Sequence, residues 1–190
     1  MKATLLINRK LVVLSTLLVL LGVFNQTANA QEEFKPITVF LVRHAEKEAE
    51  PKQDPPLTKE GVERSQLLAR MLGGAGIKTI YTSQFVRTKQ TAEPLVTKSG
   101  ATVTSLTLKP NPENLRLIAP ESTTELVNKI LERPGQNVLV IGHSNWLPDV
   151  IKMLGGDTVP TIDEQRFDDL FIVTIYAKGK ARVLQLKYGA

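Results

Sequence analysis

The chain has 190 residues, 42% of them hydrophobic, and contains no cysteine. This length fits one ordinary domain with a sizeable apolar core. The lack of cysteine excludes a disulfide framework and attachment of a lipid through a thiol. The formal net charge is +5, but three positive charges lie within the first ten residues, so the charge of the remainder does not predict a nucleic-acid-binding surface.

The first thirty residues have the pattern of a secretory signal peptide. Basic residues open the segment, residues 11–24 form an uncharged apolar stretch, and Ala28-Asn29-Ala30 has the pattern of a cleavage site. An uncleaved membrane anchor is the alternative, although a full span needs about 20 apolar residues. We therefore expect residues 1–30 to be removed on export. Residues 31–190 would form a single domain, periplasmic or extracellular, with no stable membrane insertion.

Apolar runs alternate with helical periodicity along the rest of the chain. The expected elements are, in chain order, a strand at 37–43, a helix from 58 to 72, a strand at 77–82, a helix capped by Ser83, a strand at 102–108, a helix opening with the capping box Ser122 to Glu125, a strand at 137–142, a helix carrying Trp146 to Leu154, and hairpin strands at 170–177 and 181–188. Thr58 is the expected N-cap of the first helix, and Pro94 is expected to break or kink the second. This alternation predicts an α/β fold, a three-layer α/β/α sandwich with a mainly parallel mixed sheet and a C-terminal β-hairpin.

Both histidines of the chain directly follow a predicted strand. His44 follows the run Thr38 to Arg43, and His143 follows the run Asn137 to Gly142. Such runs are typical of buried strands, and ligands of open α/β sheets bind at the carboxyl ends of the strands. Simple backbone hydrogen bonding is the alternative for each histidine, while a metal site would lack a third histidine or a cysteine. If the two strands are neighbours, both imidazoles meet in one pocket.

An imidazole in such a pocket can accept a phosphoryl group covalently. The transferring group spreads negative charge over its oxygens, so the pocket needs fixed positive charge. Arg43 and His143 would supply this charge together with Arg87. Arg87 lies at the start of a helix at the same edge and can bind phosphate through a bidentate contact. A solvated surface side chain is the alternative for Arg87. Ser144 and Asn145 open the next predicted helix, whose free N–H groups would also bind an anion.

Four stretches resemble the motifs of the histidine phosphatase superfamily, which includes phosphoglycerate mutases and many small phosphatases, and they occur in the family's order. The stretches are Phe40 to Glu46, with Arg43-His44-Ala45 resembling the Arg-His-Gly/Ala signature, Leu57 to Gly61, Ser83 to Ala92, and Val140 to Asn145. The resemblance implies that His44 is the phosphorylated nucleophile. It also implies that Arg43, Arg87 and His143 bind the phosphoryl group, and that no metal or organic cofactor is needed.

The resemblance leaves the general acid open. In the mutase-like branch this acid is a glutamate in an insertion after the helix of the second arginine, and that insertion is short here. Glu113 is the candidate by order, with an ordinary loop carboxylate as the alternative, and Ser144 stands where the acid-phosphatase branch carries aspartate. Four carboxyl groups of the loop after His44 are further candidates: Glu46, Glu48, Glu50 and Asp54.

The short connections offer little surface for holding a second phosphate, which favours hydrolysis over transfer. We expect a phosphomonoester hydrolase acting on a small phosphorylated molecule outside the cytoplasm, because the signalling partners of the small phosphohistidine phosphatases are cytoplasmic. A non-catalytic phosphate-binding module of the same fold and a mutase-like transferase are the alternatives. The pH profile of activity should be bell-shaped with its optimum at acidic pH, because His44 must be neutral while His143 works best protonated. The sequence does not indicate the oligomeric state.

Overall fold

The computed structural model describes residues 34–156 and 161–189. The predicted signal peptide lies outside these residues. Within these two ranges, no helix combines the length and the apolar composition needed to span a bilayer.

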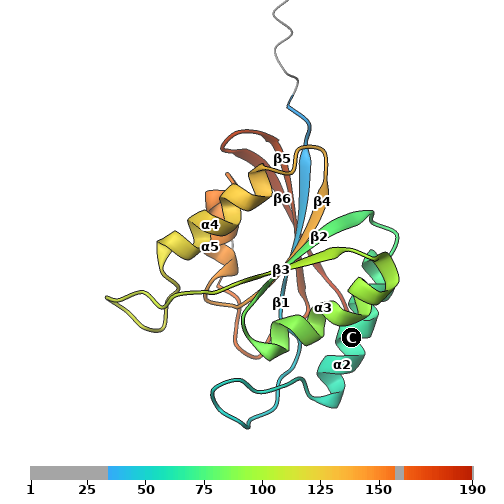
Figure 1. Cartoon of the computed structure of the whole chain (residues 1–190), viewed down its shortest axis with the longest axis vertical. Helices are drawn as coiled ribbons and strands as arrows, with labels where there is room; N and C mark the ends of the chain where they lie inside the picture. The colour runs from blue at the N-terminus through green and yellow to red at the C-terminus, as the bar shows by residue number, and fades with distance from the viewer. Residues whose placement is uncertain (1–33, 157–160, 190) are drawn as a thin grey trace, which may run out of the picture. The chain divides into compact units, whose positions relative to one another are not determined.

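Six strands form one sheet in the order β3-β2-β4-β1-β5-β6. The strands are β1 (Ile37–Arg43), β2 (Ile77–Ser83), β3 (Thr102–Leu106), β4 (Asn137–Gly142), β5 (Asp169–Ala177) and β6 (Lys180–Lys187). The first four are mutually parallel, whereas β5 runs antiparallel to β1 and forms a hairpin with β6 (Figure 1). The predicted mixed, mainly parallel sheet with its C-terminal hairpin is confirmed.

In residues 34–156 and 161–189, four helices cover the two faces of the sheet. They are α2 (Lys59–Leu72), α3 (Val86–Ser99), α4 (Pro120–Leu131) and α5 (Leu147–Met153). Figure 1 shows α4 and α5 on one side of the strands and α2 and α3 on the other. Strand β1 serves both cores by alternation, because Val39 and Leu41 pack in the cluster of α4 and α5 whereas Val42 packs in the cluster of α2 and α3. The predicted three-layer sandwich is confirmed.

Helix α2 begins as its sequence predicts. The Oγ1 atom of Thr58 accepts a hydrogen bond from the N–H of Gly61 at 3.1 Å, so Thr58 is the N-cap. Gly61 itself lies against the loop after β1, because a Cβ atom at this position would lie only 2.1 Å from the carbonyl oxygen of Glu46. The close approach fixes α2 against the segment that follows His44.

Helix α4 begins at another residue than predicted, and helix α3 is not broken at Pro94. Helix α4 begins at Pro120 rather than at a capping box, since proline fits the first helical position and Ala119 is the N-cap, while the Ser122 hydroxyl instead accepts from the N–H of Lys109 at 3.0 Å. Helix α3 continues through Pro94 to its end at Ser99. The buried side chains on either side of the proline, Ala92 and Leu95, pack in the core, and this packing holds the helix despite one lost backbone bond.

Candidate functional site

The pairing of β1 with β4 brings the two histidines together. Arg43 is in register with Gly142, and the N–H of His44 continues the ladder by donating to the Gly142 carbonyl at 3.0 Å. The two imidazole centroids lie 5.4 Å apart in an edge-on arrangement. Both residues are buried, with 3% of His44 and 7% of His143 exposed. The two strands are therefore neighbours, as expected, and the histidines lie beside each other at the carboxyl ends of the strands.

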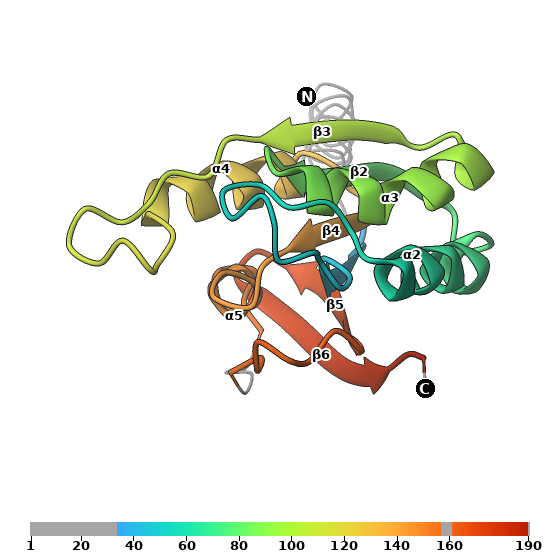
Figure 2. The ribbon, with the colours of Figure 1, turned by 90° about the horizontal axis from the view of Figure 1, so that it is seen from below.

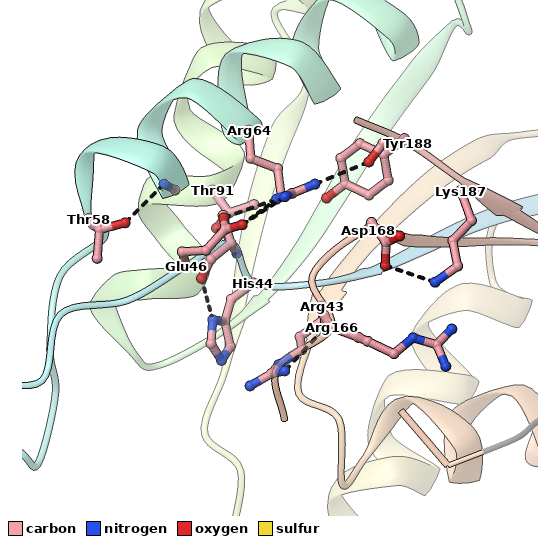
Figure 3. A network of polar contacts seen from close by, with 12 residues as sticks. Arg43, His44, Glu46, Thr58, Arg64, Thr91, Arg166, Asp168, Lys187 and Tyr188 are labelled. Atoms are coloured by element: carbon pink, nitrogen blue, oxygen red, sulfur yellow. Dashed lines mark hydrogen bonds and ion pairs between the residues drawn. The ribbon is translucent and has the colours of Figure 1, made fainter. Parts of the chain in front are cut away.

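A backbone carbonyl fixes the tautomer of His44. The Nδ1 atom lies 2.7 Å from the carbonyl oxygen of Ala45, and because a carbonyl only accepts, Nδ1 must carry the proton (Figure 3). The lone pair of the neutral ring is then on Nε2. The pKa of His44 is lowered to about 3, chiefly by burial, with the bond to Ala45 opposing the shift and the charges of Arg43 and Arg87 adding to it. The imidazole is therefore neutral and nucleophilic at neutral pH.

Arg43 is held by a segment that the sequence did not indicate. Its Nη1 atom donates to the carbonyl oxygens of Asp163, Glu164 and Arg166, and its guanidinium lies 4.1 Å from the ring centroid of Phe167. Backbone carbonyls have no sequence signature, so this arrangement could not be read from the residues. Phe167 also approaches His44, with 6.0 Å between ring centroids.

Arg87 lies in the first turn of α3, stacked on Phe85 with 4.2 Å between the guanidinium carbon and the ring centroid. Its Nη1 atom lies 3.6 Å from the Asp54 carboxylate, which also accepts from the N–H of Val86 at 2.9 Å. The loop of residues 45–57 thus closes against α3 (Figure 2). Burial lowers the pKa of Arg87 and Asp54 opposes this shift. The Nε atoms of Arg87 and Arg43 are both buried without a hydrogen-bond partner in the described part of the chain.

His143 contacts the strand on the other side of β4. Its Nε2 atom lies 2.9 Å from the hydroxyl of Ser83, at the end of β2, and its ring packs edge-on against Phe85 at 5.5 Å between centroids. Burial lowers the pKa of His143 well below the usual value, and the nearby His44, Arg87 and Arg43 add to the effect. His143 is therefore neutral in the free protein. The protonated state expected from the sequence is therefore not the state of His143 in the free protein.

Thr91 joins the loop after β1 to the helix of Arg87. Its buried hydroxyl accepts from the N–H of Ala45 at 3.0 Å and donates to the carbonyl of Arg87 at 2.7 Å. The backbone that sets His44 and the backbone that sets Arg87 therefore meet at one hydroxyl group. The sequence signal was available, because Thr91 lies in the third family-like stretch, but its role follows only from the tertiary contact.

A second link reaches from this loop to the end of the described chain. The Glu46 carboxylate forms an ion pair with Arg64 of α2. The Nε and Nη2 atoms of Arg64 lie 2.8 Å and 2.7 Å from Oε1 of Glu46. Arg64 also donates from Nη1 to the Tyr188 carbonyl at 3.1 Å (Figure 3). This pairing commits Glu46 to Arg64, so it is the least available of the carboxyl groups in the loop.

The structure does not bring together all the residues proposed for the site. Glu113 is exposed in the loop before α4, where its N–H donates to Asn111 Oδ1, and among the described residues it contacts neither histidine. Helix α5 begins only at Leu147 because Pro148 occupies its first turn, so Ser144 and Asn145 lie in a turn instead of opening the helix.

The side chain of Asn145 donates to the carbonyl of Arg116 at 2.6 Å. Its role as a phosphate ligand, and that of Ser144, stay predictions. Asp54 is the carboxyl group of the loop after His44 that lies at Arg87. Within the two described ranges, no group of three or more histidine, aspartate or glutamate side chains is placed to hold a metal ion.

Comparisons with known proteins match part of the sequence and the fold. A family model described as histidine phosphatase superfamily (branch 1) matches residues 39–109. The structure of the protein histidine phosphatase SixA complexed with tungstate is similar, with a TM-score of 0.62 and 22% identity over 79% of this chain and 96% of that one. The structure of phosphoglycerate mutase from Bacillus anthracis str. Sterne has a TM-score of 0.63 and 18% identity, and the match covers 81% of this chain and 94% of that one. The structure of a mycobacterial glucosyl-3-phosphoglycerate phosphatase has a TM-score of 0.58 and 14% identity, and the match covers 82% of this chain and 100% of that one.

A search of curated proteins gives no match. At these identities the solved structures establish the shared fold, and the family model covers the stretches that carry His44 and Arg87. The match over residues 39–109 and the shared fold confirm the predicted resemblance to the histidine phosphatase superfamily.

Proposed function

We propose that the chain is a metal-independent phosphomonoester hydrolase that works through a phosphohistidine on His44. One observation carries the proposal: a neutral imidazole with its lone pair on Nε2 lies beside a second histidine and near two arginines whose buried Nε atoms have no partner in the described residues. A phosphoryl group is a ligand that satisfies such donors, since its oxygens only accept.

In the proposed first step, Nε2 of His44 attacks phosphorus and the bond from phosphorus to the ester oxygen breaks. The electron pair leaves on that oxygen, which takes a proton from a carboxyl group. In the second step a water molecule gives its proton to the same group and attacks phosphorus, and the phosphorus–nitrogen bond breaks. The electron pair returns to Nε2, and inorganic phosphate is released. Arg43, Arg87 and His143 balance the charge of the equatorial oxygens throughout.

Asp54 and Glu113 are the competing proposals for the leaving-group acid. Asp54 lies at Arg87, whereas Glu113 is exposed in the loop before α4, which favours Asp54. The two are separated by comparing Asp54→Asn with Glu113→Gln on an alkyl phosphate and an aryl phosphate. Loss of the true acid slows the alkyl ester far more, because only the poor leaving group needs the proton. Equal slowing of both esters by a variant excludes its residue from this role.

The proposed substrate is a small phosphorylated molecule outside the cytoplasm, in the periplasm or the medium. The support for this location is the leader pattern of residues 1–30, so it stands apart from the chemistry of the site. Fractionation of cells that produce the full chain tests it. Recovery of a shortened chain in the exported fraction supports export, and a full-length chain in the cytoplasmic fraction contradicts it.

The decisive experiment is hydrolysis of an aryl phosphate by residues 31–190 with excess chelator. We expect chelator-resistant turnover in the wild type and in Gln53→Ala, an exposed position of the same loop, but none in His44→Ala. Acid-labile label from a phosphorus-labelled substrate should be trapped on the wild type alone. Unchanged turnover in His44→Ala would refute the nucleophile. Binding of phosphate without turnover of any ester would identify a binding module, and transfer to a second alcohol in preference to water would identify a mutase-like transferase.

A further inference from the structure

Ser83 occupies an unexpected place in the site. The sequence suggests that it caps the helix of Arg87, but the N-cap of α3 is Phe85. The Ser83 hydroxyl accepts only a long hydrogen bond from the Phe85 N–H, at 3.4 Å, and lies closer to His143. Ser83 is fully buried, and its Oγ atom lies 2.9 Å from Nε2 of His143 and 3.0 Å from Oγ1 of Thr88. Thr88 is also fully buried. The three side chains form a line that ends inside the protein.

The carbonyl groups at the inner end give this line a direction. The Thr88 hydroxyl lies 2.9 Å from the Phe85 carbonyl and 3.1 Å from the Ser83 carbonyl, and neither carbonyl can donate. When the Thr88 proton points to a carbonyl, Thr88 Oγ1 is free to accept from the Ser83 hydroxyl. Ser83 Oγ can then accept a proton from Nε2 of His143. The reverse direction requires an Nε2 without a proton, so it cannot serve the doubly protonated ring.

In the part of the chain that the structure describes, no other group near His143 favours a positive charge on its ring. The groups that face it are His44 at the end of β1 and the arginines Arg43 and Arg87, and each of them opposes a further positive charge. Phe85 packs on the ring but offers no acceptor. A buried N–H of the charged ring would be costly without a partner, and the Ser83 hydroxyl is the acceptor that the described residues provide.

We propose that Ser83, supported by Thr88, is a positioning residue for His143: it holds Nε2 so that Nδ1 faces the substrate and donates a proton to a phosphoryl oxygen. The proposal rests on the proposed phosphatase function. The proton on Nδ1 arrives with the phosphate ester or from solvent as the ester binds, because the free ring is neutral. The ring therefore changes from a neutral to a charged group only when an anion fills the pocket, and Ser83 makes the charged form tolerable.

The kinetic test compares four variants over a range of pH with saturating aryl phosphate. Ser83→Ala should lower kcat by about 10- to 100-fold, the range expected for an orienting bond to a charged group. It should also move the basic limb of the kcat profile to lower pH by about one unit, since tenfold in an equilibrium is one unit of pKa. Thr88→Val should act in the same direction less strongly, and Thr88→Ser should restore the profile. Ser105→Ala is the matched control, because Ser105 donates to the Ser83 carbonyl at 2.9 Å without joining the line.

A second readout is independent of turnover. The chain contains only two histidines, so the ring nitrogen signals of His143 in NMR spectra are those that persist in His44→Asn. With saturating inorganic phosphate, the pH at which His143 loses its second ring proton should be higher in the wild type than in Ser83→Ala by about one unit. Ser105→Ala should titrate like the wild type.

The outcomes separate the two proposals. A shift in the NMR titration with no hydrolysis of any ester supports the role of Ser83 and overturns the phosphatase function. Turnover with the same basic limb and the same titration in Ser83→Ala overturns the role of Ser83 alone. A loss of kcat that is equal at every pH, or a Ser105→Ala profile that shifts as far as that of Ser83→Ala, also overturns it, because either result indicates a merely structural effect.

Discussion

Replacing Thr91 with valine removes the hydroxyl that joins the loop of His44 to the helix of Arg87. Valine has nearly the same shape, so the change leaves no sizeable cavity. The Ala45 N–H, which donates to Thr91 at 3.0 Å, is left buried without a partner. An orphaned buried donor costs about 1–3 kcal/mol. In a domain of this size each kcal/mol lowers Tm by about 2–4 °C, so a cost of about 2 kcal/mol corresponds to roughly 4–8 °C.

Thr97 on the same helix provides a matched control. Its hydroxyl donates to the Glu93 carbonyl, four residues back, at 3.0 Å, as that of Thr91 does to Arg87. Thr97 is exposed, so Thr97→Val should change stability by less than about 0.5 kcal/mol. Urea unfolding measures both changes, and an unchanged m value shows that the unfolded state is unaffected.

The same variant should also affect catalysis. The Ala45 carbonyl sets the tautomer of His44, so a shift of the Ala45 backbone misplaces the nucleophile. We expect kcat/KM for an aryl phosphate to fall by roughly tenfold or more in Thr91→Val, as positioning losses do, and Thr91→Ser to recover most of it. If Thr91→Val and Thr97→Val unfold at the same urea concentration, the reasoning on Ala45 is refuted.

Three further predictions concern the site and the segment that supports it. The lowered pKa of His44, about 3 when folded against about 6.5 when unfolded, means that the unfolded chain binds more protons between these values. The free energy of unfolding should therefore fall on acidification through this window, by on the order of 2 kcal/mol from this residue at pH 4.5. In His44→Asn the urea midpoint should depend less on pH between 7.5 and 4.5. The same pH dependence in the wild type and the variant would contradict this. Asp54→Asn removes a negative charge that competes with substrate for Arg87, but keeps an acceptor for the Val86 N–H. Inhibition by inorganic phosphate should therefore become a few-fold tighter. Weaker inhibition would show that Asp54 chiefly orients Arg87. Gly61→Ala should lower the free energy of unfolding in urea by roughly 1–3 kcal/mol, because its Cβ would contact the Glu46 carbonyl. Gly74→Ala should be neutral or slightly stabilising, because a Cβ there has no atom within 4 Å. Equal urea midpoints for the two variants would show that the loop after His44 adapts without cost.

The sequence predicts the sheet and the two histidines well because central parallel strands are buried on both faces. Their continuous apolar runs are strong signals, and the carboxyl end of each run fixes where its histidine lies. The position of Arg87 follows from the strand and helix around it. These features depend on local pattern together with one rule about sheets, so little tertiary information is needed.

Other parts of the site depend on contacts that no local pattern encodes. Arg43 is anchored by three backbone carbonyls of residues 163–166, and residues with any side chain could supply such carbonyls. Ser83 has the chemistry of a helix cap, and only the neighbourhood of β2 and β4 turns its hydroxyl to His143. The start of α5 is displaced by Pro148, a steric preference that outweighs the capping ability of Ser144 and Asn145.

The place of β1 in the sheet has a consequence for the order in which the protein is made. Strand β1 is synthesised first, yet its two neighbours are β4 and β5, which begin only at Asn137 and Asp169. Until those residues leave the ribosome, the apolar side chains of β1 have no partner strands, and the loop that carries His44 has no fixed position. Long-range pairing of this kind forms slowly. The site around the two histidines can therefore assemble only when nearly the whole chain is available, so partly made chains lack it.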